Sequence, residues 1–234
     1  MDDFTLIIPA HNEEFRIKGT LESFSKTFGN KTKIIVVSNG SSDNTGKILG
    51  EWKKTHKNFD FLDFPEKLGK GGAVLEGLKR VKTKKMGFMD ADDAFDLNQI
   101  KKLMNLVGKY DCVIGSKWKE RNFFQVTEPG FRKIMSRGWN VLVRILVGLE
   151  YKDTQAGAKF FTKEAFDKID TEKFVSKNFS FDVELLYKFK RNKMNIKEIY
   201  VPSKHREGSS FGYKEIIPMF KNLIQVSIYR FFGR

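Results

Sequence analysis

Short apolar runs alternate with amphipathic stretches through the first half of the chain. The runs are rich in Ile, Val, Phe and Met, as β-strands are; they cover 5–10, 33–38, 86–91 and 111–116. The stretches between them have helical periodicity and lie near 13–28, 44–55, 72–82 and 97–108. This alternation predicts an α/β fold with a mostly parallel sheet flanked by helices on both faces.

The second half has a more helical pattern. A long helix is predicted over 131–149, and a polar loop, DTQAG, separates it from the strand-like AKFF. Helices near 163–168 and 180–192, a strand IKEIYVP and a helical segment over 213–233 follow. Because no repeat, low-complexity tract or linker interrupts the chain, we predict one catalytic domain, 1–212, with a C-terminal helical elaboration, 213–234.

Composition narrows the possible partners. The 234 residues carry 43 Lys and Arg against 29 Asp and Glu, and this net charge of +14 indicates a polyanionic partner. One cysteine, Cys112, excludes an internal disulfide framework and suits a reducing compartment. The start of the chain does not resemble a signal peptide, and no apolar run reaches 18 residues. We therefore expect a cytoplasmic protein with at most peripheral membrane contact.

Polar residues follow three of the predicted strands. They are 11–13 after the first, 39–43 after the second and Asp90-Ala91-Asp92 after the third. Ligands of such sheets bind beyond the carboxyl ends of the strands. Alternate residues of an extended segment point the same way, so Asp90 and Asp92 predict a site for a hard cation, Mg²⁺ or Mn²⁺. The alternative is that an acid here caps the helix near Leu97, and this reading is favoured for Asp96.

The ordered motifs IIPAHNEE, NGSSDNT, LGKGGAVLEG and DADD resemble those of inverting nucleotide-sugar glycosyltransferases with the glycosyltransferase-A fold. GSK, FRKIMSRGWN, DTQAGAKFF, FDVELL and HREGSSF resemble the branch that uses dolichyl or polyprenyl phosphate, the glucosyl- and mannosyltransferases. The resemblance covers about 4–212. Two positions depart from it: Asn39 stands where Asp is usual, and Lys117 replaces an Arg that would bind phosphate in a bidentate manner.

The resemblance and the local chemistry together predict the site. Donor-binding candidates are Pro9, Ala10, Asn12, Glu13, Asn39, Lys70, Gly71, Asp90, Ala91, Asp92, Lys117, Arg206 and Ser209. Candidates for the acceptor phosphate are Ser116, Arg132, Lys133, Arg137 and Gln155. The catalytic candidates are Asp92, Asp182 and Arg206.

Simpler structural explanations stay open for several of these candidates. Asn12 and Glu13 could form a capping box at a helix start, and 68–72 could be an ordinary glycine-rich turn. Asp182 could be a helix-N-terminal charge. Lys133, Arg137, Asn140 and Arg144 share one helix face, which is either a phosphate-binding stripe or a solvated surface.

The predicted reaction transfers a hexose from UDP-glucose or GDP-mannose to dolichyl or polyprenyl phosphate, with inversion at the anomeric carbon. The acceptor phosphate has a second pKa of about 6, so it is ionised at neutral pH and needs no strong base. One alternative is a glycan or protein hydroxyl acceptor, and another is nucleotidyl transfer. Nucleic-acid binding is suggested by charge alone and lacks a recognition motif, so no such partner is expected.

The segment 213–233 has a stripe of apolar residues flanked by Lys214, Lys221 and Arg230. The stripe consists of Ile217, Phe220, Ile224, Ile228 and Phe231. It fits either core packing or a helix lying in the plane of a membrane surface.

Overall fold

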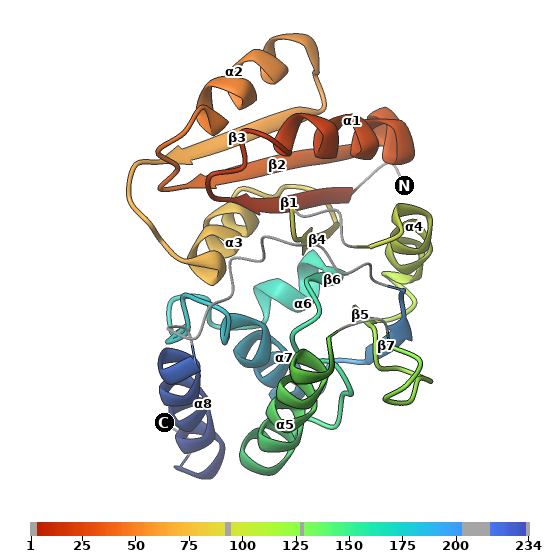
Figure 1. The fold of residues 1–234 in the computed structure, drawn as a ribbon, viewed down its shortest axis with the longest axis vertical. Coiled ribbons are helices and arrows are strands. Elements are labelled where there is room, and N and C mark those ends of the chain that lie inside the picture. The colour runs from red at the N-terminus through yellow and green to blue at the C-terminus, as the bar shows by residue number, and fades with distance from the viewer. Residues whose placement is uncertain (1–3, 92–94, 127–128, 203–215, 233–234) are drawn as a thin grey trace.

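A seven-stranded sheet forms the centre of the molecule (Figure 1). The computed structural model describes residues 4–91, 95–126, 129–202 and 216–232. The strands are β1 (Phe4–Ala10), β2 (Thr32–Asn39), β3 (Phe59–Phe64), β4 (Lys85–Met89), β5 (Cys112–Ser116), β6 (Ala158–Thr162) and β7 (Ile196–Tyr200). Their order is β3-β2-β1-β4-β6-β5-β7; β6 runs antiparallel to β4 and β5, and the other pairs are parallel. The predicted mostly parallel α/β sheet is therefore confirmed.

The helices occupy the predicted places with boundaries shifted by a few residues. They are α1 (Ile17–Phe28), α2 (Thr45–Thr55), α3 (Lys70–Lys79), α4 (Leu97–Leu106), α5 (Gly130–Val147), α6 (Lys163–Asp167), α7 (Phe181–Arg191) and α8 (Ile216–Phe232), with a 3₁₀ turn, η1 (Gly29–Lys31). None of the helices within the described ranges is long and apolar enough to cross a bilayer.

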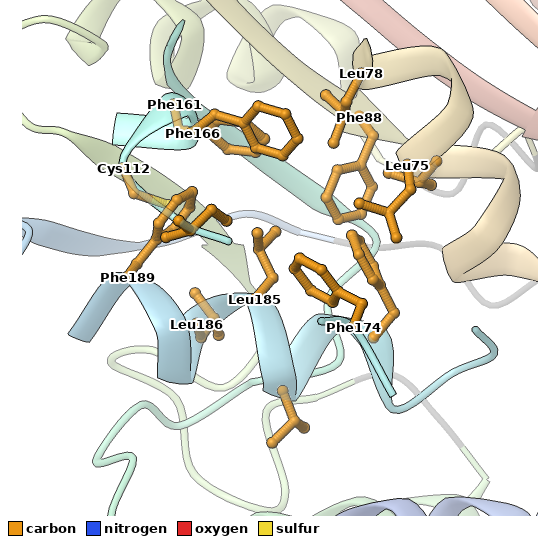
Figure 2. Packing of buried hydrophobic residues seen from close by; sticks show 14 of the residues in the cluster. Leu75, Leu78, Phe88, Cys112, Phe161, Phe166, Phe174, Leu185, Leu186 and Phe189 are labelled. Atoms are coloured by element: carbon orange, nitrogen blue, oxygen red, sulfur yellow. The ribbon is translucent and has the colours of Figure 1, made fainter. Parts of the chain in front are cut away.

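Alternating side chains divide the core into two layers. In β1, Leu6 and Ile8 pack with residues of α1, α2 and α4, whereas Ile7 packs on the opposite face. That opposite face is covered by α3, α6 and α7, with α5 and α8 at its outer side. Figure 2 shows leucine and phenylalanine side chains of α3, α7 and the central strands meeting between helix and sheet. The period of two in the strands thus produces helices on both faces.

β3 is a strand that the sequence pattern did not predict. Its sequence, FDFLDF, places acids among aromatic residues, and of its side chains only Phe59 is fully buried. β3 lies at one edge of the sheet, where one side of the ladder is open and charged residues are tolerated. The apolar signal is therefore weaker here than in the central strands.

The order of the strands creates a switch point between β1 and β4. The chain moves outward through β2 and β3, then returns to place β4 on the other side of β1. Because β6 is antiparallel, its first residue, Ala158, pairs with Met89 at the end of β4. The loop before β6 therefore joins the loops after β1, β2 and β4 at one edge, where ligands of α/β sheets bind.

Candidate active site

The loops after β1 and β2 are joined by hydrogen bonds. Asn12 has a positive φ of 55°, and its Oδ1 accepts a bond of 2.8 Å from the backbone N–H of Ser42. The backbone N–H of Glu13 donates to Oγ1 of Thr45 at 2.8 Å. α1 begins only at Ile17, and its N-terminal residue has no side-chain cap. The alternative of a capping box beginning at Asn12 is therefore wrong, because left-handed backbone at Asn12 cannot start a helix.

Asp43 organises the same pair of loops. Its Oδ1 accepts from the backbone N–H of Thr45 at 3.0 Å, and its Oδ2 accepts from that of Glu14 at 3.1 Å. Burial pushes the pKa of Asp43 upward, but the bonds from Thr45 and Glu14 outweigh it and hold the pKa below its usual value. Asp43 was not among the predicted site residues, although the NGSSDNT motif contains it. Its carboxylate joins the loops after β1 and β2 by accepting from one N–H group of each.

Asn39 connects β2 to the glycine-rich turn. Its Oδ1 accepts a bond of 2.6 Å from the backbone N–H of Leu68, and its carbonyl bonds Nδ1 of His11 at 2.9 Å. The side chain is buried. Asn39 thus connects three loops through its side chain and its backbone carbonyl, and its predicted contact with the nucleoside stays a prediction.

Glycines in the turn allow α3 to approach the start of α7. Gly69 has a φ of 78°, and a Cβ there would lie 2.0 Å from Oδ1 of Asn178. A Cβ on Gly71 would lie 2.4 Å from Cβ of Phe181. These glycines therefore serve close packing, which brings the N-terminus of α3 and the side chain of Lys70 against the first turn of α7.

Four charged side chains form a chain across this edge of the sheet. Nζ of Lys70 lies 2.8 Å from Oδ1 of Asp90 and 3.7 Å from Oδ2 of Asp182. Oδ1 of Asp182 receives a bond of 2.5 Å from Nζ of Lys159, which also donates to the carbonyl of Ala156 at 2.6 Å. Lys159 and Asp182 are fully buried. Asp182 does lie in the first turn of α7, but it is also a partner in this network.

Asp90 sits against the backbone of the loop before β6. Its N–H donates to the carbonyl of Gly157 at 3.0 Å, and a Cβ on Gly157 would lie 1.8 Å from Oδ2 of Asp90. The Asp90 side chain stays 31% exposed. Among the residues that the structure describes, no three His, Cys, Asp or Glu side chains cluster as metal ligands. Asp92, the second predicted ligand, lies outside those residues, as do Arg206 and Ser209.

The carboxylates of this edge suit a divalent cation in chemical type. Asp90 offers an accessible oxygen, and Oδ2 of Asp182 is buried without a hydrogen-bond partner in the described part of the chain. Mg²⁺ and Mn²⁺ take oxygen ligands and commonly share them with a diphosphate. The residues present therefore fit the predicted cation.

Asp96, another acid near this edge, has a structural role. Its side chain accepts from the N–H groups of Asn98 and Gln99, which confirms the prediction that Asp96 caps α4.

The predicted acceptor side is built around Asp153. Its Oδ2 accepts from the backbone N–H of Lys117 at 3.1 Å, while the N–H groups of Lys152 and Asp153 donate to Oε1 of Glu198. The hydroxyl of Ser116 is buried and accepts from the N–H of Lys119 at 2.9 Å. The Ser116 side chain is thus engaged in its own turn, and its predicted contact with phosphate is not tested by this arrangement.

α5 is tied to the same loop by Asn140. Oδ1 of Asn140 accepts from both N–H and Oγ1 of Thr154 at 3.0 Å, and Nδ2 donates to the carbonyl of Ser136. Asn140 is buried, so it does not belong to a solvated stripe. The next residue of the loop, Gln155, has a buried Nε2 with no partner among the described residues. An unsatisfied donor at this position fits the predicted acceptor contact.

The basic residues of α5 lie in different surroundings. Nζ of Lys133 donates to the carbonyl of Phe123 at 3.0 Å, and the guanidinium of Arg137 lies 4.3 Å from the centroid of the Trp118 ring. Arg132 and Arg144 are exposed. The predicted single stripe of Lys133, Arg137, Asn140 and Arg144 is therefore divided: Lys133 and Arg137 lie over aromatic rings of the preceding loop, Asn140 is buried, and Arg144 is exposed.

The carboxylate of Glu184 is engaged with backbone groups and is not positioned to act as a base. It is buried and accepts from the N–H groups of Val175 and Ser176. Burial raises the pKa of Glu184, and the two N–H bonds oppose that rise. Burial likewise raises the pKa of the Cys112 thiol, so this cysteine is unreactive core.

Lys159 belongs to the DTQAGAKFF motif, whose polar residues the resemblance places beside the sugar and the acceptor, but it is not among the predicted site residues, and the structure places it in β6 rather than in a loop. A lysine inside the strand AKFFT, flanked by fully buried residues, was the available signal, because a buried lysine needs an acidic partner. Pro9, Ala10 and Ala91 lie at the end of β1 and just after β4, as predicted, beside the switch point.

Comparison with known proteins adds to this geometry. A family model described as Glycosyl transferase family 2 matches residues 5–170. The dolichyl-phosphate beta-glucosyltransferase ALG5D of Trichomonas vaginalis is 30% identical over 240 residues, covering 96% of this chain and 73% of the relative. The dolichyl-phosphate beta-glucosyltransferase of Saccharomyces cerevisiae is also 30% identical, with 94% and 72% covered.

A relative with a different sugar in its name matches as well. The UDP-N-acetylglucosamine–dolichyl-phosphate N-acetylglucosaminyltransferase of Methanococcus voltae is 30% identical, covering 92% of this chain and 91% of that protein. Among solved structures, glucosyl-3-phosphoglycerate synthase from Mycobacterium tuberculosis in complex with Mn²⁺ and UDP-glucose has a TM-score of 0.69 at 19% identity, with 98% and 79% covered. That likeness shows the fold.

Proposed function

Because this chain belongs to glycosyl transferase family 2 and is a glycosyltransferase of the glycosyltransferase-A fold, we propose that it transfers glucose from UDP-glucose to dolichyl or polyprenyl phosphate with inversion at the anomeric carbon. The relatives named as dolichyl-phosphate glucosyltransferases support glucose. Residues 1–212 form the catalytic domain of this proposal, and 213–234 form a segment that associates with the membrane.

The observation that carries the proposal is the convergence of Asp90, Lys70 and Asp182 at the switch point of the sheet. The ammonium of Lys70, on the first turn of α3, stands beside the helix N-terminus, where phosphate oxygens are favoured. A nucleoside diphosphate leaving group gains negative charge as the sugar departs. In this proposal Lys70 stabilises that charge, and Arg206 adds a second cation.

A divalent cation completes the donor side of this proposal. Asp90 and Asp92 would hold Mg²⁺ or Mn²⁺, which when bound neutralises charge on the diphosphate. The carboxylate of Asp182 keeps Lys70 and Lys159 oriented, because it lies between their two ammonium groups. The loops at Asn12, Glu13 and Asn39 shape the nucleoside pocket.

The acceptor side needs positioning more than proton transfer. A phosphate monoester is already ionised at neutral pH, so a direct attack on the anomeric carbon requires no strong base. Nε2 of Gln155 and the cations Arg132, Lys133 and Arg137 are proposed to orient the phosphate. Since Asp182 is committed to Lys159 and Glu184 to backbone N–H groups, neither is freely placed to deprotonate a hydroxyl acceptor.

The test is a donor and acceptor screen. Radiolabelled UDP-glucose, UDP-N-acetylglucosamine and GDP-mannose are each incubated with Mn²⁺ and either a polyprenyl phosphate or a soluble glycan, and the lipid phase is extracted. We expect label from UDP-glucose in the lipid phase with release of UDP, and a β-linked product by NMR. Transfer only to the soluble glycan would contradict the lipid acceptor, and release of pyrophosphate would indicate nucleotidyl transfer.

A further inference from the structure

Exposed large hydrophobic side chains gather on two neighbouring helices. On α5 they are Phe131, Ile134, Met135, Val141, Leu142 and Ile145, with exposures from 38% to 64%. On α8 they are Ile217, Phe220, Ile224, Ile228 and Phe231, with exposures from 42% to 68%. Elsewhere in the described residues, only Phe15 and Phe124 are comparably exposed. Such a concentration marks an interaction surface.

Each helix has a buried face and an apolar outer face. The exposed apolar residues of α5 are separated by three, four or seven positions and so share one helix face, while Val143 and Val147 on its other side join the core. On α8, Leu223 and Val226 join the same core cluster. The stripe on α8 is therefore not core, so that earlier alternative is wrong. Since both helices bury one face in one cluster, their outer faces both turn away from it.

The two helices form one surface. They pack against each other, as the lower part of Figure 1 shows. Nη1 of Arg230, near the end of α8, donates to the carbonyl of Ile145 at 3.0 Å, and the Arg230 guanidinium packs over Gly148. This bond caps the C-terminal end of α5 with a positive charge, which the helix dipole favours. We name the exposed faces of α5 and α8 the two-helix surface.

Charge decides what this surface fits. Neither helix contains an acidic residue, while Arg132, Arg144, Lys221 and Arg230 are exposed on them. A symmetric dimer would place this cationic surface against itself, and like charges brought together are unfavourable. An anionic lipid surface complements both the cations and the apolar side chains.

We propose that the two-helix surface docks the protein in the interfacial layer of an anionic bilayer, with α5 and α8 both inserted. This proposal extends the proposed function, and one of its consequences, the access of the lipid acceptor, depends on that function. The inner face of α5 holds Thr154 through Asn140, next to Gln155. Docking through α5 therefore places the loop predicted to bind the acceptor phosphate directly behind the membrane-facing helix, so that the polyprenyl chain can stay in the bilayer.

Vesicle flotation tests the surface without any substrate. The probes are phosphatidylcholine vesicles and vesicles that also contain phosphatidylglycerol. The variants are Ile134→Glu with Ile145→Glu on α5, Ile224→Glu with Ile228→Glu on α8, and all four together. The control is Phe15→Glu, since Phe15 is 94% exposed and lies in the segment before α1. Figure 1 shows α1 in the upper part of the molecule, whereas α5 and α8 are in the lower part.

We expect each pair to reduce partitioning into the anionic vesicles by roughly tenfold or more, and the combination to abolish it. Phe15→Glu should bind as the unchanged protein does. Replacing Arg144 and Lys221 with Gln should weaken binding to anionic but not to neutral vesicles, and added salt should do the same. Circular dichroism and thermal unfolding check that each variant is folded.

Three results would overturn the proposal. The first is that the unchanged protein fails to float with anionic vesicles. The second is that folded variants of α5 float as well as the unchanged protein does. The third is that ultracentrifugation shows a stable dimer that the same substitutions dissociate. Transfer to a short, water-soluble polyprenyl phosphate analogue separates this failure from failure of the proposed function. If the unchanged protein transfers sugar to the analogue but does not bind vesicles, docking alone is contradicted. If it binds vesicles but transfers sugar to no phosphate acceptor, the function alone is contradicted.

Discussion

Lys159 shows how one residue can support an entire site. It lies in β6 between β4 and β5, is fully buried, and joins the carboxylate of Asp182 to the carbonyl of Ala156. A buried ion pair contributes little relative to apolar packing, but removal of one partner leaves the other charge unpaired inside the protein. Because Asp182 is buried, its negative charge requires a cationic partner, and Lys159 provides it.

Lys159→Met keeps most of the length of the side chain and removes its charge. We expect it to lower the free energy of unfolding by about 3–5 kcal/mol, because the buried carboxylate of Asp182 loses the closer of its two ammonium partners. Urea denaturation measures this change. Lys168→Met is the control, since the Lys168–Glu164 pair is on the surface, and it should leave the midpoint unchanged. If both variants unfold at the same urea concentration, the buried pair does not contribute to the stability of the fold.

At the scale of elements, α5 has two functions on two faces. Its outer face is apolar and exposed, and its inner face holds the loop at 153–157 through Asn140. Thr154 is completely buried, so both of its donors depend on the amide of Asn140. The position of the loop predicted to bind the acceptor is thus set by a helix that lies earlier in the chain.

Asn140→Ala should expose this dependence. We expect a loss of about 1–3 kcal/mol in stability, because the N–H and hydroxyl of Thr154 lose a buried acceptor. We also expect KM for the phosphate acceptor to rise more than KM for UDP-glucose, since the donor loops do not contact Asn140. Steady-state kinetics with each substrate varied measures both. Asn98→Ala, at an exposed position of α4, is the control; a parallel rise in both KM values would contradict a local effect.

For the whole molecule, the site exists only where β4, the loop before β6, α3 and α7 meet. Asp90 follows β4, Gly157 precedes β6, Lys70 begins α3, and Asp182 begins α7. None of these elements holds a cation or a diphosphate by itself. Their relative placement depends on the packed phenylalanine and leucine side chains of Figure 2.

Gly157→Ala tests this assembly. The added methyl would overlap the carboxylate of Asp90, so we expect metal-stimulated UDP binding to disappear and turnover to fall by about 10²-fold or more. Calorimetry of UDP binding with Mn²⁺ and with EDTA measures the first effect, and unchanged protein in EDTA should behave like the variant. Gly19→Ala adds the same methyl in open space on α1 and should bind UDP normally. Tight UDP binding by Gly157→Ala would contradict the role of Asp90.

Much of the fold was predictable from the sequence because its signals are local. Buried central strands need continuous apolar runs and helices need one apolar face, so β1, β2, β4 and β5 and all eight helices were located. The cap at Asp96 was predicted for the same reason, since it depends on two N–H groups within three residues. β3 was missed because an edge strand tolerates the acids that interrupt its pattern.

The site was predictable only in part. Motif order located Asp90, Lys70 and Asp182 as separate candidates, and it also placed Asn140 on a basic stripe. The structure instead buries Asn140, divides the stripe, joins Asp90 to Asp182 through Lys70, and adds Lys159 as a buried partner of Asp182. Such pairings link residues from 20 to more than 90 positions apart, and no periodic pattern along the chain encodes them.

The sequence by itself thus determined the elements, the family resemblance and the chemical types gathered at the strand ends, because each depends on neighbouring residues. Only the tertiary structure decided which charges meet, which polar groups are buried, and which apolar stripes stay exposed. The stripe on α8 illustrates the difference: its periodicity is the same whether the face is core or surface. Packing of Leu223 and Val226 against the core leaves Ile224 and Ile228 outside, because a helix can bury only one side in a single cluster.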